Sequence, residues 1–252
     1  MQKKDVKFNC PIHGEVTSQV YSKDWNAWDK NKPIEWSEPK CPLCEKIKTI
    51  HTNLYPERKE NTLDNFDAYS PQLKKLHAEI LSYVKNLQYQ QKHNLILVGG
   101  VGVGKTHLAC AIINYAVKHY AMNCYYKYEG DLLAMGYIKQ GWKDSNNKTY
   151  KEYDLPKNVY DKYYNCELLV IDDVASKDAW TSADKDIYTN IIHNRYEYKK
   201  PTIITSNYPI KNTDKQKTDL QKLLGKRIID RMLADKSLVI TIQAESYRTK
   251  NN

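Results

Sequence analysis

The sequence predicts an α/β protein: a parallel five-stranded sheet flanked by helices, preceded by a small N-terminal domain. From residue 94 onward, short and continuous apolar runs alternate with helical stretches, a pattern typical of parallel strands that are covered on both faces. Residues 1–60 lack a long amphipathic period and contain clustered cysteines, five prolines and three tryptophans. The length of 252 residues, 41% of them hydrophobic, suits one full domain and a small appendage.

The elements follow from local patterns. An amphipathic helix is expected over 71–91, with Ser70 as its N-cap and Pro71 at its first position. Strands are expected at 94–98, 123–128, 167–171, 202–205 and 238–242, and further helices at 105–119, 132–140 and 187–198. This division predicts an N-terminal domain at 1–60, a linker with its helix at 61–91, and the sheet domain at 92–252.

Charge and hydropathy restrict the classes of function. The net charge is +9, and residues 211–252 carry ten basic and five acidic groups, which favours contact with a polyanion such as nucleic acid. A solvated lysine-rich surface explains that charge equally well. The longest apolar runs, such as 95–98, are too short to cross a bilayer, and the first ten residues lack a secretory apolar stretch. We therefore expect a cytoplasmic protein with no membrane partner.

A phosphate-binding loop is the strongest motif. Residues 99–106, GGVGVGKT, match G-x-x-x-x-G-K-[ST], with the strand NLILV before them and an apolar helix after them. The expected contacts with ATP or ADP come from Gly99, Gly100, Val101, Gly102, Val103, Gly104, Lys105 and Thr106. Their backbone N–H groups would surround the phosphates, the lysine would reach the β- and γ-phosphates, and the threonine hydroxyl would ligate Mg²⁺.

Polar residues at the ends of two later strands complete this site. The run ELLVIDD ends in Asp172, expected to hold Mg²⁺ through water, and Asp173, expected to polarise the attacking water. Aspartate is a shorter arm than glutamate at the second position, so slow hydrolysis is expected. Asn207 follows the strand 202–205 and would lie at the same edge of a parallel sheet, where it could orient water or contact the γ-phosphate.

The main part of the chain resembles the AAA+ ATPases of the DnaC/DnaI helicase-loader group. The resemblance rests on GVGVGKTHLA (100–109), ELLVIDDV (167–174), RYEYKKPTIITSN (195–207), KRIIDRM (226–232) and ESYR (245–248), with the lead-in LDNFDAYSPQ (63–72). It implies that His107 joins the nucleotide-binding set and that Asn207 is the sensor 1 residue. It also implies that Arg227 is an arginine finger for a neighbouring subunit and that Arg248 is the sensor 2 arginine.

The resemblance also implies partners. A loader would bind a hexameric replicative helicase of the DnaB type, bind single-stranded DNA and self-associate through its ATPase domain. The compact chain suits a phage-encoded member acting in the cytoplasm of a bacterial host. Two alternatives stay open: an IstB-like ATPase that assists a transposase on duplex DNA, and a protein that captures the helicase and inhibits it with little turnover.

The N-terminal cysteines predict a structural zinc site. The pairs C-x₂-H and C-x₂-C, separated by 27 residues, offer the four ligands Cys10, His13, Cys41 and Cys44. His51 is an alternative histidine ligand. The spacer leaves room for a hairpin carrying Trp25, Trp28 and Trp36, which could form this domain's core or a protein interface. By analogy with DnaI-type loaders, residues 1–60 would dock on the helicase.

Two segments are candidates for contact with DNA. Residues 142–165 interleave five lysines with five tyrosines, a combination that suits single-stranded DNA but also a solvated connector. Residues 211–231 form a second basic stretch. The three remaining cysteines, Cys110, Cys124 and Cys166, lie on expected core elements and are interpreted as packing residues.

Overall fold

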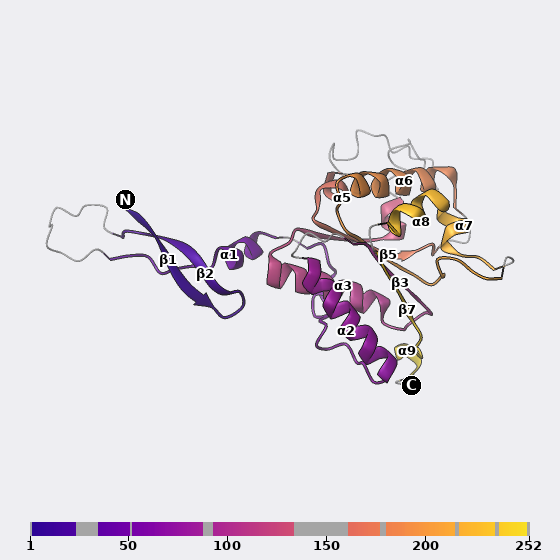
Figure 1. The fold of residues 1–252 in the computed structure, drawn as a ribbon, viewed down its shortest axis with the longest axis horizontal. Coiled ribbons are helices and arrows are strands. Elements are labelled where there is room, and N and C mark those ends of the chain that lie inside the picture. Colours follow the sequence, from indigo (N-terminus) through magenta and orange to yellow (C-terminus); the bar gives the residue numbers. More distant parts are fainter. Residues whose placement is uncertain are drawn as a thin grey trace, which may run out of the picture. The chain divides into compact units, whose positions relative to one another are not determined.

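The computed structural model describes residues 2–23, 35–50, 52–87, 93–133, 161–176, 180–214, 217–234 and 237–250. The chain forms two compact units (Figure 1). The first, called the N-terminal unit, comprises Met1–His51 together with Val117–Met122. The second, called the sheet unit, comprises Thr52–Ala116 and Asn123–Asn252.

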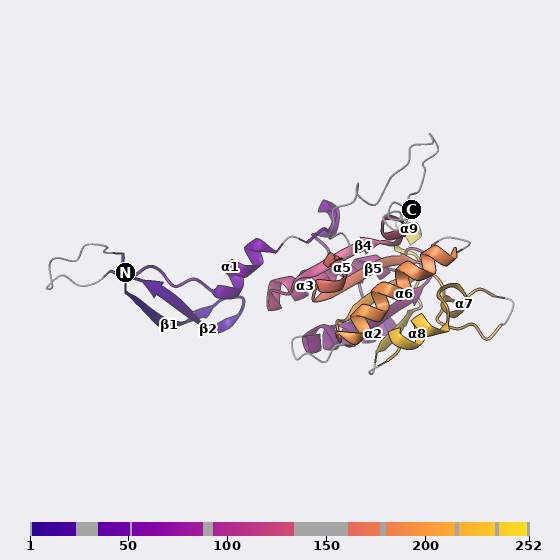
Figure 2. The same cartoon turned by 90° about the horizontal axis from the view of Figure 1, so that it is seen from above.

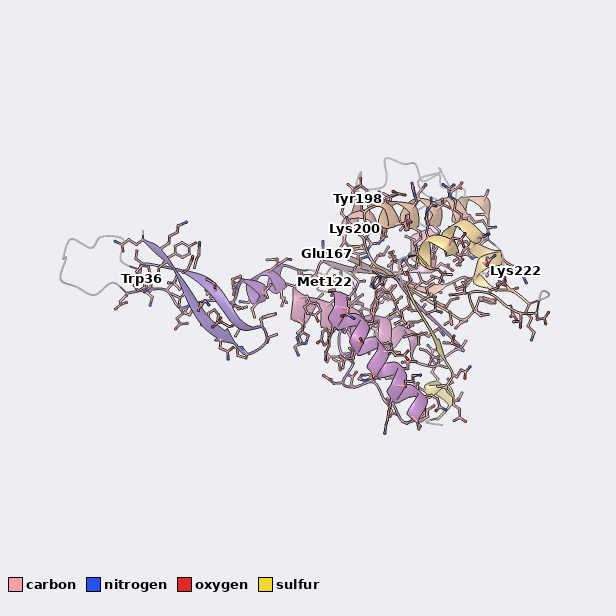
Figure 3. The ribbon with its side chains drawn as sticks, viewed as in Figure 1. Trp36, Met122, Glu167, Tyr198, Lys200 and Lys222 are labelled. Carbon is pink, nitrogen blue, oxygen red and sulfur yellow. The ribbon has the colours of Figure 1, made fainter. Side chains whose placement is uncertain are left out.

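The N-terminal unit is built on an antiparallel hairpin of β1 (Lys3–Cys10) and β2 (Gly14–Tyr21), followed by α1 (Pro42–Thr49). Gly14 pairs with Cys10 and closes the turn with φ +69°, a backbone conformation that favours glycine. The turn of this hairpin holds the first cysteine–histidine pair. Between the two pairs, Ser22 and Trp36 form an antiparallel bridge, and residues 24–34, where the predicted hairpin would turn, lie outside the described residues. Trp36 (Figure 3) is half-buried, and Lys4 Nζ lies 4.3 Å from its ring centroid. Trp25 and Trp28 lie outside the described residues.

This unit buries very little apolar surface. Of its described residues before 51, the buried apolar side chains are Cys10, Val20 and Cys41. The buried polar ones are Ser18, which accepts from the Lys40 amide at 3.0 Å, and Ser22. A core of this size does not offset the conformational entropy of some fifty residues, so the unit needs a further crosslink.

The sheet unit contains the predicted parallel sheet. Its strands are β3 (Leu95–Gly99), β4 (Cys124–Tyr128), β5 (Leu168–Val174), β6 (Thr202–Ser206) and β7 (Leu238–Ile242). They are hydrogen-bonded in the order β4-β5-β6-β3-β7, with every pair parallel. The prediction of a five-stranded parallel sheet is confirmed. The main difference lies in β5, which continues through both aspartates to Val174 instead of ending at 171.

Helices cover both faces of the sheet. On one face lie α5 (Asp161–Asn165), α6 (Ser182–Glu197), α7 (Leu220–Leu224) and α8 (Lys226–Met232), and on the other α2 (Pro71–Asn86) and α3 (Lys105–Tyr120) (Figure 1). Figure 2 shows α6 and α8 beside each other over the sheet. Ile96 and Val98 of β3 belong to the same core cluster as α6, so Leu95 and Leu97, which alternate with them, point to the α2 and α3 face.

Helix ends follow local hydrogen bonds. The predicted cap of α2 is present, with the Leu73 amide donating to Ser70 Oγ at 3.2 Å, but the described helix ends at Asn86. The start of α6 at Ser182, five residues before the predicted one, reflects a capping box between Thr181 and Asp184. Residues 129–133 are helical, and the rest of the predicted helix 132–140 lies outside the described residues.

Two short elements lie near the carboxyl edge of the sheet. A 3₁₀ turn, η1 (Pro56–Arg58), belongs to residues 52–70 before α2, which are called the lead-in segment from here on and begin before the resembling stretch 63–72. Helix α9 (Tyr247–Lys250) follows β7. Within the described ranges, we find no helix whose length and hydropathy would allow it to cross a bilayer.

Candidate nucleotide site and metal centre

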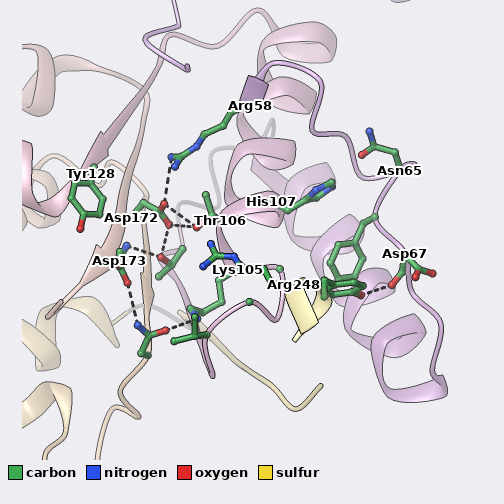
Figure 4. A pocket seen from close by; sticks show the side chains of 17 residues that line it. Arg58, Asn65, Asp67, Lys105, Thr106, His107, Tyr128, Asp172, Asp173 and Arg248 are labelled. Atoms are coloured by element: carbon green, nitrogen blue, oxygen red, sulfur yellow. Dashed lines mark hydrogen bonds and ion pairs between the residues drawn. The ribbon is translucent and has the colours of Figure 1, made fainter. Parts of the chain in front are cut away.

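A cavity of about 670 Å³ opens at the carboxyl edge of the sheet (Figure 4). This volume is within the usual range for small-molecule sites. The lining side chains come from six segments: the phosphate loop with the start of α3, the ends of β4, β5 and β6, the lead-in segment, and the C-terminal segment. Ten of the predicted site residues line it, namely Val101, Gly102, Gly104, Lys105, Thr106, His107, Asp172, Asp173, Asn207 and Arg248.

Lys105 is held where the loop and two strands meet. Its Nζ donates to the carbonyls of Gly99 (2.9 Å) and Gly100 (2.6 Å), and to Asn207 Oδ1 (2.8 Å). Burial lowers the pKa of this amine, and the nearby carboxylates oppose that shift. Gly99 and Gly100 therefore contribute to the site by accepting hydrogen bonds from Lys105 with their carbonyls. Val103 is buried beneath the loop, and none of these three residues lines the cavity.

Asp172 is oriented by hydroxyl groups from three elements. Thr106 Oγ1 donates to both carboxylate oxygens (3.1 and 3.0 Å), Thr205 Oγ1 to Oδ1 (2.6 Å) and Tyr126 OH to Oδ2 (2.6 Å). The aspartate is 2% exposed. A carboxylate beside a threonine hydroxyl at the first turn of α3 is a donor set that fits Mg²⁺, which prefers oxygen ligands and retains several waters.

Asp173 reaches the same cavity because the backbone departs from a regular strand. Successive side chains of a strand point to opposite faces, yet both aspartates line the cavity. Asp173 has φ +59° and Ala175 has φ +67°, and the register with β6 shifts between Ile171 and Val174. Left-handed backbone costs roughly 1–2 kcal/mol for each residue other than glycine, so the surroundings must hold this bulge.

The charge on Asp173 is disfavoured by its position. Burial and the neighbouring Asp172 carboxylate raise the pKa of Asp173, while Lys105 and Arg248 act in the opposite direction. Asn207 Nδ2 donates to Asp173 Oδ1 at 3.3 Å, and its Oδ1 accepts from Lys105. The amide therefore links the lysine to the aspartate, which is the arrangement expected of a residue that orients water and a terminal phosphate.

The lead-in segment supplies site residues to which sequence reasoning assigned no role. Arg58 directs its guanidinium toward Asp172 (Figure 4), with Nη1 3.6 Å from Oδ2. The guanidinium lies 5.2 and 5.0 Å from the ring centroids of Tyr55 and Tyr126. Asn114 of α3 holds the carbonyls of residues 58, 59 and 61. The resemblance to the loader group begins at residue 63 in this segment, so no signal in the sequence pointed to Arg58.

Aromatic rings form the other end of the cavity. Phe66 lies 5.6 Å from the ring of His107 and 6.1 Å from that of Tyr247. A Cβ at Gly104 would approach Phe66 Cε2 to 2.8 Å, and φ there is +95°, so glycine is required at this position. Flat rings beside a phosphate loop can take a nucleobase.

The two remaining predicted arginines lie in different places. Arg248 lines the cavity from α9, next to Tyr247, whose amide donates to the Gly102 carbonyl at 3.0 Å. Arg227 is exposed on α8 and is not among the residues that line the cavity of its own chain. An arginine finger that acts on a neighbouring subunit would need this kind of exposure.

The four predicted zinc ligands of the N-terminal unit lie together. The ligand atoms of Cys10, His13, Cys41 and Cys44 are all within 4.8 Å of one another. His13 Nδ1 lies 3.5, 3.4 and 3.4 Å from the three sulfurs, and the sulfurs of Cys10 and Cys44 are 3.7 Å apart. Zinc bonds of about 2.3 Å to sulfur and 2.0 Å to nitrogen give tetrahedral edges of about 3.5–3.8 Å. The alternative ligand His51 lies outside the described residues.

The electrostatics of this quartet also fit a cation. Hydrogen bonds from the backbone amides of Ile12 and His13 lower the pKa of Cys10 to about 6, which favours its thiolate. Burial and the neighbouring thiols of Cys10 and Cys41 raise the pKa of Cys44 to about 11. A divalent cation would relieve that repulsion. Four protein ligands leave no open position, so the metal's role would be structural.

Comparison with known proteins identifies the family. Residues 48–252 match the profile described as IstB-like ATP binding protein. An insertion-sequence IS232 protein of Bacillus thuringiensis subsp. berliner, described as ATP-binding, is 32% identical over 81% of this chain and 73% of its own length. The replicative helicase loader DnaC of Buchnera aphidicola subsp. Baizongia pistaciae is 30% identical over 69% of this chain, which spans 65% of that relative.

Solved structures show the same fold. A crystal structure of the DnaC helicase loader matches 75% of this chain and all of that chain with a TM-score of 0.63 and 22% identity. The structure of DnaI matches 80% of this chain and 98% of that chain with a TM-score of 0.59 and 22% identity. With its phosphate loop and paired acids at the edge of such a sheet, the chain belongs to the family of IstB-like ATP-binding proteins and is a DnaC/IstB-like AAA+ ATPase.

Proposed function

We propose that this protein is an ATP-dependent loader that delivers a hexameric, DnaB-type replicative helicase to single-stranded DNA. The observation that supports this most is that one chain combines two parts. The sheet unit is similar to DnaC loaders, and a separate unit with a Cys₃His cluster lies almost wholly outside the IstB-like match. In this proposal, the N-terminal unit grips the helicase, while the sheet unit binds ATP and self-associates.

The chemistry follows from the chain's own residues. Lys105 and the loop amides bind the phosphates, and the aromatic end of the cavity receives the base. Thr106 and Asp172 would hold Mg²⁺, which supplies charge neutralisation at the β- and γ-phosphates. Asp173 accepts a proton from the attacking water, and Asn207 orients that water. The developing charge on the γ-phosphoryl group is then stabilised by Arg248 of the same chain and Arg227 of the neighbouring subunit.

Exposed basic side chains are candidates for contact with DNA. Lys211, Lys217, Lys226 and Arg227 are exposed around α7 and α8. They could follow phosphates once subunits assemble. The other predicted stretch, 142–165, lies mostly outside the described residues.

A second candidate function is that of an IstB-like helper ATPase for a transposase on duplex DNA. The family profile and the 32% identity to the IS232 protein favour it. It would require a preference for duplex over single-stranded DNA. The Cys₃His unit argues for the loader instead, because it provides a separate module for a protein partner.

A helicase-loading assay tests the proposed function. Circular single-stranded DNA coated with its binding protein receives the host's replicative helicase, ATP and this protein, and unwinding of an annealed strand is followed. We expect stimulation that is lost in Lys105→Ala and in Cys41→Ser. Inhibition of unwinding by the wild type would favour a helicase-capturing protein. No effect together with tighter binding to duplex DNA would replace the loader with the transposition helper.

The arginine finger is tested by mixing subunits. Arg227→Ala should lower ATP turnover by about 100-fold or more while ATP binding is retained. Adding Lys105→Ala subunits, which cannot hold the phosphates but carry Arg227, should restore part of the turnover. Lys226→Ala removes the adjacent exposed charge as a control and should have little effect on turnover measured without DNA. Full turnover by Arg227→Ala alone would exclude its role.

The zinc site is tested by metal analysis. We expect one zinc per chain by elemental analysis, and none in Cys41→Ser, because three ligands hold zinc much more weakly than four. Cys124→Ala, a buried cysteine of β4, should keep the zinc. ATP affinity should be unchanged in Cys41→Ser, because its ligands belong to the other unit. Full zinc content in Cys41→Ser would show that Cys41 is not a ligand.

The raised pKa of Asp173 predicts a trade between stability and function. Because the folded protein favours the neutral carboxyl, Asp173→Asn should raise the melting temperature at pH 7.5 by about 1–3 °C. The gain should fade as the pH falls through the raised pKa of the folded protein. It should be gone below about 4, the ordinary pKa of an aspartate, where the carboxyl is protonated in both the folded and the unfolded chain. Asp186→Asn, at an exposed position of α6, serves as the control. A gain that persists unchanged at pH 3 would contradict this account.

A further inference from the structure

Glu129 is a fully buried carboxylate outside the nucleotide cavity. It follows directly on β4 and is 0% exposed. Its Oε1 accepts from the Ala175 amide (2.7 Å) and from Tyr188 OH (3.1 Å), and its Oε2 from the Ser176 amide (2.9 Å) and Ser176 Oγ (3.0 Å). These four donors are neutral. Burial raises the pKa of Glu129, and the four hydrogen bonds oppose that shift.

Two of those donors are consecutive backbone amides of the turn that follows the catalytic strand. Ala175 and Ser176 come two and three residues after Asp173, and Ala175 is itself left-handed. Two further contacts hold the same bulge from β6: Thr205 Oγ1 accepts from the Asp173 amide at 2.8 Å, and Ser206 Oγ donates to the Val174 carbonyl at 2.6 Å. The bulge is thus fixed from both neighbouring strands.

This bulge is what turns Asp173 into the cavity beside Asp172. Without it, the regular alternation of β5 would point the second carboxylate to the opposite face. Two amides converging on one carboxylate, with a tyrosine hydroxyl from α6, determine where the turn can lie. Because Glu129 does not line the cavity, it can affect the reaction only through the backbone that it holds.

We propose that Glu129 is a positioning residue for hydrolysis: it holds the left-handed bulge after β5 and so aims the Asp173 carboxylate at the attacking water. This inference rests on the proposed role of Asp173. ATP binding depends on other groups, namely the phosphate loop and Asp172. Loss of Glu129 should therefore slow turnover without weakening nucleotide binding.

The test separates turnover from binding. Glu129→Gln keeps the size of the side chain but replaces one acceptor by a donor, which cannot bond an amide N–H. We expect kcat to fall between about 10-fold and 100-fold, while the Kd of a fluorescent ATP analogue with Mg²⁺ stays within about threefold. Asp184→Asn removes another buried carboxylate, in the capping box of α6, and should change stability more than kcat.

A double-mutant cycle distinguishes positioning from a general loss of structure. In an Asp173→Asn background, Glu129→Gln should lower kcat by less than about twofold, because its target is already removed. Additive losses, or equal losses of kcat and ATP binding, would overturn the proposal. If Glu129→Gln does not fold, Glu129→Asp, which keeps the charge on a shorter arm, must show the same pattern. If Asp173→Asn keeps full turnover, the proposed role of Asp173 is wrong. If Asp173→Asn abolishes turnover while Glu129→Gln keeps it, only the inference about Glu129 is wrong.

Discussion

The parallel register of β5, β6 and β3 determines where the reactive groups of the sheet unit lie. Because β6 pairs with both of its neighbours, Asn207 is placed between the strand that leads into the phosphate loop and the strand that carries the acids. Its amide then spans Lys105 and Asp173 with two hydrogen bonds. A shift by one residue in either pairing would turn side chains to the other face and break this chain of contacts.

The two adjacent aspartates of the nucleotide site are held in place in different ways. Two adjacent carboxylates face Lys105, Arg58 and Arg248, and each acid is held differently: Asp172 by three hydroxyl donors, Asp173 by an irregular backbone. The first arrangement orients a carboxylate that is suited to a cation. The second brings Asp173 into a partly buried position beside Asp172, where its charge is unfavourable. A carboxyl with a raised pKa would suit the proposed role of proton acceptor.

The sequence predicted the elements better than it predicted their contacts. All five strands, the cap at Ser70 and the four-residue cysteine–histidine cluster follow from local spacing and chemistry, which a single sequence displays. Arg58, Phe66 and Glu129 were missed because their roles come from contacts with residues far along the chain. The extension of β5 was also missed, since a left-handed aspartate within a strand is favoured only by its neighbours in the fold.

The two units rely on different sources of stability, and this bears on function. The sheet unit buries a large apolar core, whereas the N-terminal unit buries few apolar side chains and gathers four metal-ligating groups instead. The sheet unit is also the part shared with relatives of two kinds, one from an insertion sequence and one a helicase loader. A nucleotide site that both kinds of relative share does not determine which partner protein each of them binds. The residues that choose the partner should therefore lie largely before residue 48, on a surface whose shape depends on the metal-ligating quartet rather than on ATP.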